Sequence, residues 1–229
     1  MESACLIQTP TPNLQQSQDF YEQIGFVPLD NSRLIWTDAK AHIEINPDRF
    51  ARAGIKLFKS DWSKEVGHLQ LITKVIAVGG GYVLADPSGT WIYLIEKEPP
   101  IQTGKRGDSI GMLGNFHGVS LETMDLDKSI LIFENLGLSH TGGSTEQGYI
   151  VCSLGDFSVS LMKPLSCPHL FFNPSLTYFN SKNNLSIIAK LREVGVSFSE
   201  EITIFNEEGL VDNVTIRDPG GIGFFIFSD

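Results

Sequence analysis

The chain has 229 residues, and 17 basic against 27 acidic side chains give it a formal charge of −10. Apolar residues at 41% and charged residues at 19% are typical of a globular protein and exclude a disordered one. The acidic balance excludes nucleic acid as a partner, and no apolar run of about 18 residues is present to span a membrane. Three cysteines without close pairing, and no basic leader, lead us to expect a cytoplasmic protein.

In chain order, the first half alternates strands with two short helices. The elements expected there are strand 4–8, helix 14–24, strands 26–29, 33–37 and 41–46, strand 55–59, a weak helix 63–72 and two strands flanking Asp86. The second half repeats this order. Its expected elements are strand 119–123, helix 126–136, strands 149–153 and 157–162, strand 176–179, helix 184–194, and strands 196–204, 211–217 and 222–227.

An internal repeat relates the two halves, because the segment from Ser17 to Phe26 is similar to the segment from Ser129 to Leu138. Each helix is expected to have a polar N-cap and a closing glycine in the left-handed conformation. These residues are Asn13 and Gly25 in the first copy and Asp125 and Gly137 in the second.

Both halves end in a strand, an Asp-Pro-x-Gly turn and a further strand, at Asp86 and at Asp218. We expect each aspartate to stabilise its turn by accepting hydrogen bonds from the amides that follow, and not to act in catalysis. The repeat predicts two domains, residues 1–98 and 114–229, joined by a linker over residues 99–113 that is rich in turn-forming and charged residues.

The motif Asn13-Leu-Gln-Gln-Ser17-Gln-Asp-Phe20-Tyr21, its weaker copy from Asp125, and the two hairpins together resemble the vicinal oxygen chelate superfamily. This group includes glyoxalase I, extradiol dioxygenases, fosfomycin-resistance transferases and bleomycin-binding proteins. The resemblance implies an α+β fold with two tandem glyoxalase-like domains. Each domain would consist of two βαβββ modules forming a curved, cup-shaped mixed sheet, which in relatives usually holds a divalent metal and a small substrate.

In metal-dependent relatives the ligands come from the first and fourth strands of a module and from the matching strands of its partner. Here Glu44 stands where the family has a carboxylate ligand, but the first strand from Cys5 to Gln8 contains no histidine. Where relatives often have glutamate after the Asp-Pro-x-Gly turn, the first copy has Tyr93 and the second has Phe225. The resemblance therefore implies an incomplete metal site.

Two histidines complete the candidate metal set with Glu44. His42 shares a strand face with Glu44, so the two can hold a metal or act as an acid–base pair, unless that face is simply solvated. His117 lies one residue out of register with the family's histidine, which turns its side chain to the other face unless a bulge intervenes.

Three aromatic residues, Trp36, Trp91 and Tyr93, are expected to line an apolar ligand pocket in the first copy, with core packing as the alternative. These features favour a protein that binds a small molecule in an apolar cup. The alternative is a metal-dependent lyase or dioxygenase of the vicinal oxygen chelate type, and whether the chain is an enzyme stays open. No cofactor is assigned, a divalent metal belongs to the alternative, and a homodimer is left open.

Overall fold

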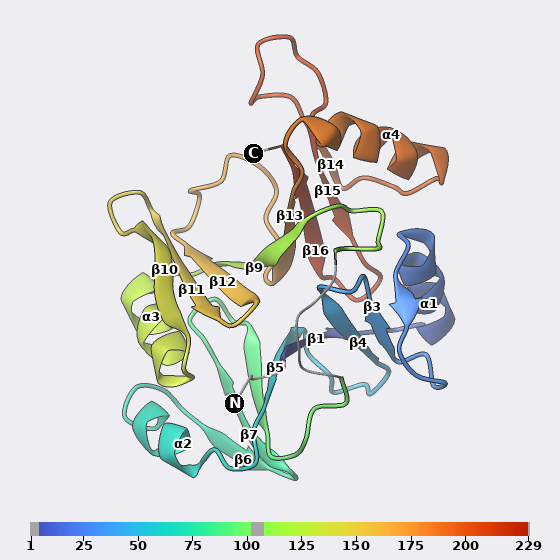
Figure 1. The fold of residues 1–229 in the computed structure, drawn as a ribbon. Coiled ribbons are helices and arrows are strands. Elements are labelled where there is room, and N and C mark those ends of the chain that lie inside the picture. Colours follow the sequence, from blue (N-terminus) through green and yellow to red (C-terminus); the bar gives the residue numbers. More distant parts are fainter. Residues whose placement is uncertain (1–4, 102–107, 229) are drawn as a thin grey trace.

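In the computed structural model, which describes residues 5–101 and 108–228, the chain folds into two mixed sheets and four α-helices (Figure 1). The elements of the first half are β1 (Cys5–Pro10), α1 (Leu14–Gln23), β2 (Val27–Pro28), β3 (Ile35–Thr37), β4 (His42–Asn46), β5 (Gly54–Phe58), α2 (Ser63–Leu69), β6 (Ile76–Val78), β7 (Gly81–Ala85) and β8 (Trp91–Ile95). Those of the second half are β9 (Phe116–Glu122), α3 (Leu126–Asn135), β10 (Ser139–Ser144), β11 (Tyr149–Leu154), β12 (Phe157–Met162), β13 (Ser175–Phe179), α4 (Asn184–Glu193), β14 (Glu200–Ile202), β15 (Asn213–Arg217) and β16 (Gly223–Phe227).

The N-terminal sheet has the strand order β2-β3-β4-β1-β5-β8-β7-β6, and the C-terminal sheet has the order β10-β11-β12-β9-β13-β16-β15-β14. The two orders match strand for strand, so the sequence repeat is also a structural repeat. Each sheet combines two βαβββ modules, which confirms the expected α+β architecture. Residues 102–107 of the predicted linker lie outside the described residues.

The helix boundaries follow from the residues singled out in the sequence. Asn13 accepts a hydrogen bond from the Gln16 amide at 3.2 Å, and Asp125 accepts one from the Lys128 amide at 3.0 Å. The glycine after each helix has a positive φ, which an L side chain adopts only with strain. Both predicted N-caps are therefore confirmed.

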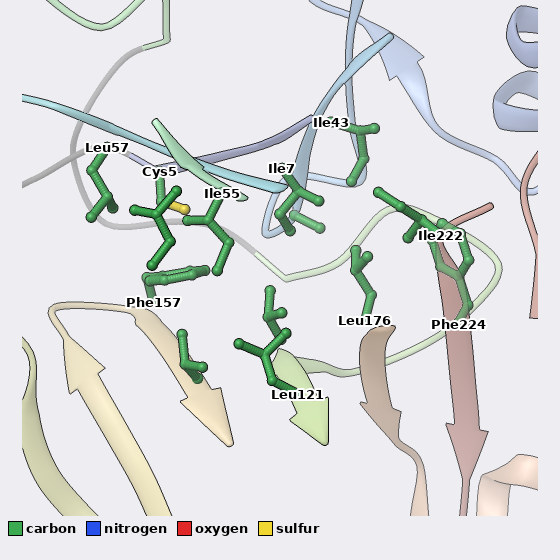
Figure 2. Packing of buried hydrophobic residues seen from close by; sticks show 14 of the residues in the cluster. Cys5, Ile7, Ile43, Ile55, Leu57, Leu121, Phe157, Leu176, Ile222 and Phe224 are labelled. Atoms are coloured by element: carbon green, nitrogen blue, oxygen red, sulfur yellow. The ribbon is translucent and has the colours of Figure 1, made fainter. Parts of the chain in front are cut away.

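The two sheets share one hydrophobic core, because apolar residues alternate along their facing strands. In Figure 2, Ile7 and Ile55 of the N-terminal sheet lie opposite Leu121 and Leu176 of the C-terminal sheet, and all four belong to the same buried cluster. Burying one such aliphatic side chain contributes about 1.5–3 kcal/mol. The opposite face of each sheet, here called the outer face, is therefore the one on which a ligand cup can form.

The modules pair across the two halves. Helices α2 and α3 lie side by side (Figure 1). At the other end of the molecule, the Gln23 side chain donates to the Val194 carbonyl at 2.8 Å and so joins the end of α1 to the end of α4. Module one therefore packs with module four, and module two with module three. Among the described residues no helix is both long and apolar enough to cross a membrane.

The two turn aspartates stabilise their turns as expected. Asp86 Oδ1 accepts from the Ser88 and Thr90 amides at 3.0 and 3.2 Å, and Asp218 Oδ1 accepts from the Ile222 amide at 2.7 Å. Their second oxygens cross to the other half of the chain, which the sequence did not predict. Asp86 Oδ2 accepts from the Ser129 hydroxyl at 3.1 Å.

The crossing bonds of Asp218 are more extensive. Its Oδ2 accepts from the Thr9 hydroxyl at 2.6 Å and from the Tyr21 phenol at 2.9 Å, and all three side chains are buried. A third aspartate, Asp38, accepts from the Tyr178 phenol at 2.9 Å. Each half of the chain therefore places buried carboxylates against hydroxyl groups of the other half.

Candidate functional site

Strand register brings four polar side chains to the centre of the outer face of the N-terminal sheet. Gln8 of β1 lies beside Glu44 of β4, and Lys56 of β5 lies beside Tyr93 of β8. Lys56 is also the cross-strand partner of Leu6, which lies two residues before Gln8 on the same face of β1. The four positions therefore form one cluster, here called the N-terminal centre. They come from the first and fourth strands of both modules.

Glu44 and Lys56 form an ion pair at this centre. The Lys56 ammonium donates to both Glu44 carboxylate oxygens, each at 2.7 Å, and the two side chains are 14% and 23% exposed respectively. The Lys56 Nζ also lies 5.8 Å from the centre of the Tyr93 ring, in a cation–π contact. Glu44 is therefore paired with Lys56, and not with the metal or the His42 side chain considered from the sequence.

The remaining polar groups of the centre bond within the protein. Gln8 donates to the Arg52 carbonyl at 2.8 Å and accepts from the Asn46 amide at 2.9 Å. The Tyr93 hydroxyl donates to the same Arg52 carbonyl at 3.2 Å. Burial raises the pKa of Tyr93, so its phenol stays protonated at neutral pH.

An apolar hollow lies next to this centre on the outer face. Trp91 and Tyr93 are 6.1 Å apart between ring centres, and Trp91 forms part of the wall of a hollow of about 250 Å³. The other residues of that wall come from strands β6 and β7 and the turn before them: Thr73, Lys74, Ile76, Val83, Leu84 and Ala85. On the other side of the centre, Leu6, Phe58 and Ile101 form a small buried cluster that occupies that part of the outer face.

The structure places the other predicted residues of this site in two different settings. His42 lies on the outer face, two residues before Glu44 on β4, as the strand alternation predicted. Trp36 does not line this face, which corrects the expectation from sequence. It pairs with Ile43 on the core side, is fully buried, and stacks on Tyr21 with ring centres 6.3 Å apart.

The matching centre of the C-terminal sheet has hydroxyl and aromatic side chains in place of the ion pair. Register places Ser120, Ser160, Thr177 and Phe225 at the four corresponding positions. The Ser120 and Thr177 hydroxyls lie 2.7 Å apart and bond to each other. No charged side chain occupies any of these four positions.

The outer face of the C-terminal sheet is covered by the chain itself. Residues 163–174, here called the covering segment, connect β12 to β13. They place the ring centres of His169 and Phe171 at 5.1 and 4.8 Å from the ring centre of Phe225. Two carboxylates bind its backbone, because Glu122 accepts from the Leu165 amide and Glu200 accepts from the Leu170 amide. The aromatic side chains that fill this face thus come from the connection as well as from the strands.

His117 lies on the C-terminal sheet and not with Glu44 and His42. Strand β9 has a register shift between Phe116 and Gly118, so His117 occupies a bulge, and its ring lies 5.1 Å from that of Phe179. The bulge that the sequence left open is therefore present. Nowhere in residues 5–101 and 108–228 do three His, Cys, Asp or Glu side chains come together in a group that can hold a metal ion.

No family model and no curated protein matches this sequence. Solved structures do match: a mutant of 4-hydroxymandelate synthase from Streptomyces coelicolor has a TM-score of 0.58 and 13% identity, covering 96% of this chain and 90% of that one. Catechol 2,3-dioxygenase has a TM-score of 0.53 and 11% identity, with 96% and 85% covered. A 2,2',3-trihydroxybiphenyl 1,2-dioxygenase from Sphingomonas wittichii strain RW1 has a TM-score of 0.50 and 14% identity, with 96% and 88% covered.

The chain has the vicinal oxygen chelate fold. The resemblance read from the sequence motifs is confirmed at the level of fold, since 96% of the chain aligns with 90% and 85% of the first two structures. Identities of 11–14% carry no information about substrate or reaction.

The divalent metal that the vicinal oxygen chelate fold implies does not fit either centre. A catalytic site for such an ion uses about three carboxylate or imidazole ligands and an open position. The N-terminal centre supplies one carboxylate, and both of its oxygens already accept from the Lys56 ammonium. The C-terminal centre supplies three hydroxyl groups and a phenylalanine.

Sequence reasoning missed Lys56, Gln8 and Asn46. Lys56 does carry a local signal, because it alternates with Gly54 and Phe58 on the outer face of β5. Its role became visible only through the register that sets β5 beside β1 and β1 beside β4, which joins residues far apart in the sequence.

Proposed function

We propose that this protein binds a small, largely apolar molecule on the outer face of its N-terminal sheet and needs no metal ion to do so. The observation that supports this most directly is the hollow of about 250 Å³ beside Trp91, on a face with a polar centre. Small-molecule sites are typically concave and apolar with a few polar groups that orient the ligand. The covered outer face of the C-terminal sheet leaves the N-terminal one as the better candidate.

The test is a ligand-observed NMR screen of small aromatic compounds, followed by titration of each hit against two variants. Trp91→Ala removes the aromatic wall of the hollow, so we expect its affinity for each hit to fall about tenfold, the equivalent of about 1.4 kcal/mol. Phe50→Ala is the matched control, because Phe50 is also aromatic but 67% exposed and not part of the wall of the hollow. Hits that bind both variants with wild-type affinity would contradict the proposal.

Elemental analysis of the purified protein separates the proposal from the alternative, a metal-dependent lyase or dioxygenase. We expect no stoichiometric Mn, Fe, Ni or Zn, and no change in melting temperature when a chelator is added. A stoichiometric metal whose removal abolishes ligand binding would favour the alternative.

A further inference from the structure

The groups at the N-terminal centre can be sorted by which hydrogen bonds remain available. Both polar atoms of the Gln8 amide already bond within the protein, to Arg52 and Asn46. The Tyr93 hydroxyl donates to Arg52 as well. An ammonium group has three N–H donors, and two of those on Lys56 point to the Glu44 oxygens. The Gln8 amide has a second N–H, but Gln8 is only 2% exposed, so among these four side chains Lys56 is the one with a donor that a ligand can reach.

The position and exposure of Lys56 make this donor reachable. Its side chain is 14% exposed, enough for contact with a bound molecule while most of the chain is buried. The ammonium lies over the face of the Tyr93 ring, and Tyr93 in turn lies beside Trp91 at the hollow. A molecule resting on Trp91 and Tyr93 therefore has Lys56 at its inner end.

The charges at this centre determine which kind of ligand atom can accept the hydrogen bond from Lys56. Glu44 neutralises Lys56, so the pair has no net charge, and the chain as a whole has a formal charge of −10. A carboxylate brought to Lys56 would lie close to the Glu44 carboxylate and be repelled. A neutral carbonyl oxygen accepts the same hydrogen bond without that repulsion.

We propose that the Lys56 ammonium takes the place of a metal ion in this cup, and that the ligand is a neutral aromatic molecule whose carbonyl oxygen accepts a hydrogen bond from it. This inference rests on the proposed function, because it names the class of ligand for the same site. The ring lies against Tyr93 and Trp91, and the oxygen points to the centre.

Three naphthalene probes of matched shape test this: 2-acetylnaphthalene, 2-isopropenylnaphthalene and 2-naphthoate. Wild-type protein should bind the ketone about tenfold more tightly than the hydrocarbon, because a hydrogen bond from a charged group contributes at least that factor. The carboxylate should bind no more tightly than the ketone. Tighter binding of the carboxylate would overturn the inference.

The variant Glu44→Leu/Lys56→Met replaces the pair with apolar side chains of similar length and leaves no buried charge without a partner. In this variant the preference for the ketone should disappear, so that the ketone and the hydrocarbon bind equally. A preference for the ketone that survives the double substitution would show that Lys56 is not its donor. A divalent ion bound stoichiometrically at Glu44 in wild-type protein would also overturn the inference.

The hydrocarbon separates this inference from the proposed function. If it binds wild-type protein and loses affinity in Trp91→Ala, the proposed function stands, whatever the ketone does. If wild-type protein then binds the ketone no more tightly than the hydrocarbon, only the role of Lys56 is overturned. If no probe binds, the proposed function fails and the inference fails with it.

Discussion

At the scale of single residues, Asp218 combines two tasks that are usually separate. One oxygen stabilises its own turn, and the other accepts from Thr9 and Tyr21 of the opposite half of the chain. Burial raises the pKa of Asp218 above the ordinary 3.8, although the hydrogen bonds from Thr9 and Tyr21 act in the other direction. Desolvation therefore outweighs hydrogen bonding at this carboxyl.

The raised pKa of Asp218 predicts a definite dependence of stability on pH. The native state retains this proton to a higher pH than the unfolded chain does. The contribution is therefore fully present below about 3.8 and is lost as the pH rises through the raised value. We expect the free energy of unfolding of wild-type protein, relative to Asp218→Asn, to increase as the pH falls from 7 towards 4.

Urea unfolding of both proteins over this pH range measures the difference, because the asparagine variant cannot titrate at that position. The exposed Asp156, replaced by Asn, serves as the control and should follow wild type at every pH. A difference between wild type and Asp218→Asn that stays constant across the range would contradict the prediction.

At the scale of elements, the covering segment explains why the two sheets do not offer the same surface. The connection between β4 and β5 in the N-terminal half is short, whereas its counterpart between β12 and β13 is longer and folds back over the outer face. His169 and Phe171 rest on Phe225 there, and burial lowers the pKa of His169, so it packs as a neutral ring. The connection between β12 and β13 therefore closes the outer face of the C-terminal sheet, while that of the N-terminal sheet has no such cover from its shorter connection.

The double variant His169→Ala/Phe171→Ala should open the outer face of the C-terminal sheet. We expect 1-anilinonaphthalene-8-sulfonate to fluoresce more strongly with this variant than with wild type, because the phenylalanine side chains of β16 become accessible. The loss of stability should stay below the roughly 3–5 kcal/mol typical of truncating a fully buried phenylalanine. Phe50→Ala is the control for removal of a ring, and dye fluorescence equal to wild type in the double variant would contradict this account.

At the scale of the whole molecule, the two halves share one hydrophobic core. Apolar residues of both sheets belong to a single buried cluster, and buried carboxylates bond across the same boundary. A half of the chain on its own would expose the face that now packs against the other sheet. We therefore expect the two structural repeats to unfold together and not as two independent domains.

The tryptophans make this cooperativity measurable. All three, Trp36, Trp62 and Trp91, lie in the N-terminal half, so tryptophan fluorescence reports on that half alone. Leu121→Ala removes a fully buried side chain from the C-terminal sheet and should lower stability by about 2–5 kcal/mol. We expect the tryptophan transition in urea to shift together with the transition seen by circular dichroism.

The matched control is Leu131→Ala, which truncates the same residue type at a position 48% exposed on α3. It should leave both transitions close to those of wild type. If Leu121→Ala shifted the circular dichroism transition while the tryptophan transition stayed in place, the halves would unfold separately.

The sequence by itself determined the repeat, the order of most elements but not strand β6, and the ends of helices α1, α3 and α4. These features depend on signals only a few residues long: an N-cap such as Asn13, a glycine with positive φ such as Gly25, and the Asp-Pro-x-Gly turns. It also placed His42 and Glu44 on one strand face, because alternation along a strand is a local property.

Only the tertiary structure decided the partner of Glu44, the burial of Trp36 and the place of the covering segment. Each depends on which strands become neighbours and in what register, and these pairings join residues that are distant in the sequence. Whether Trp36 faced the cup depended on pairing with Ile43, and whether His117 changed face depended on a bulge in β9. A strand shows which residues share a face, but only its packing in the folded molecule decides which face is buried and what lies opposite each side chain.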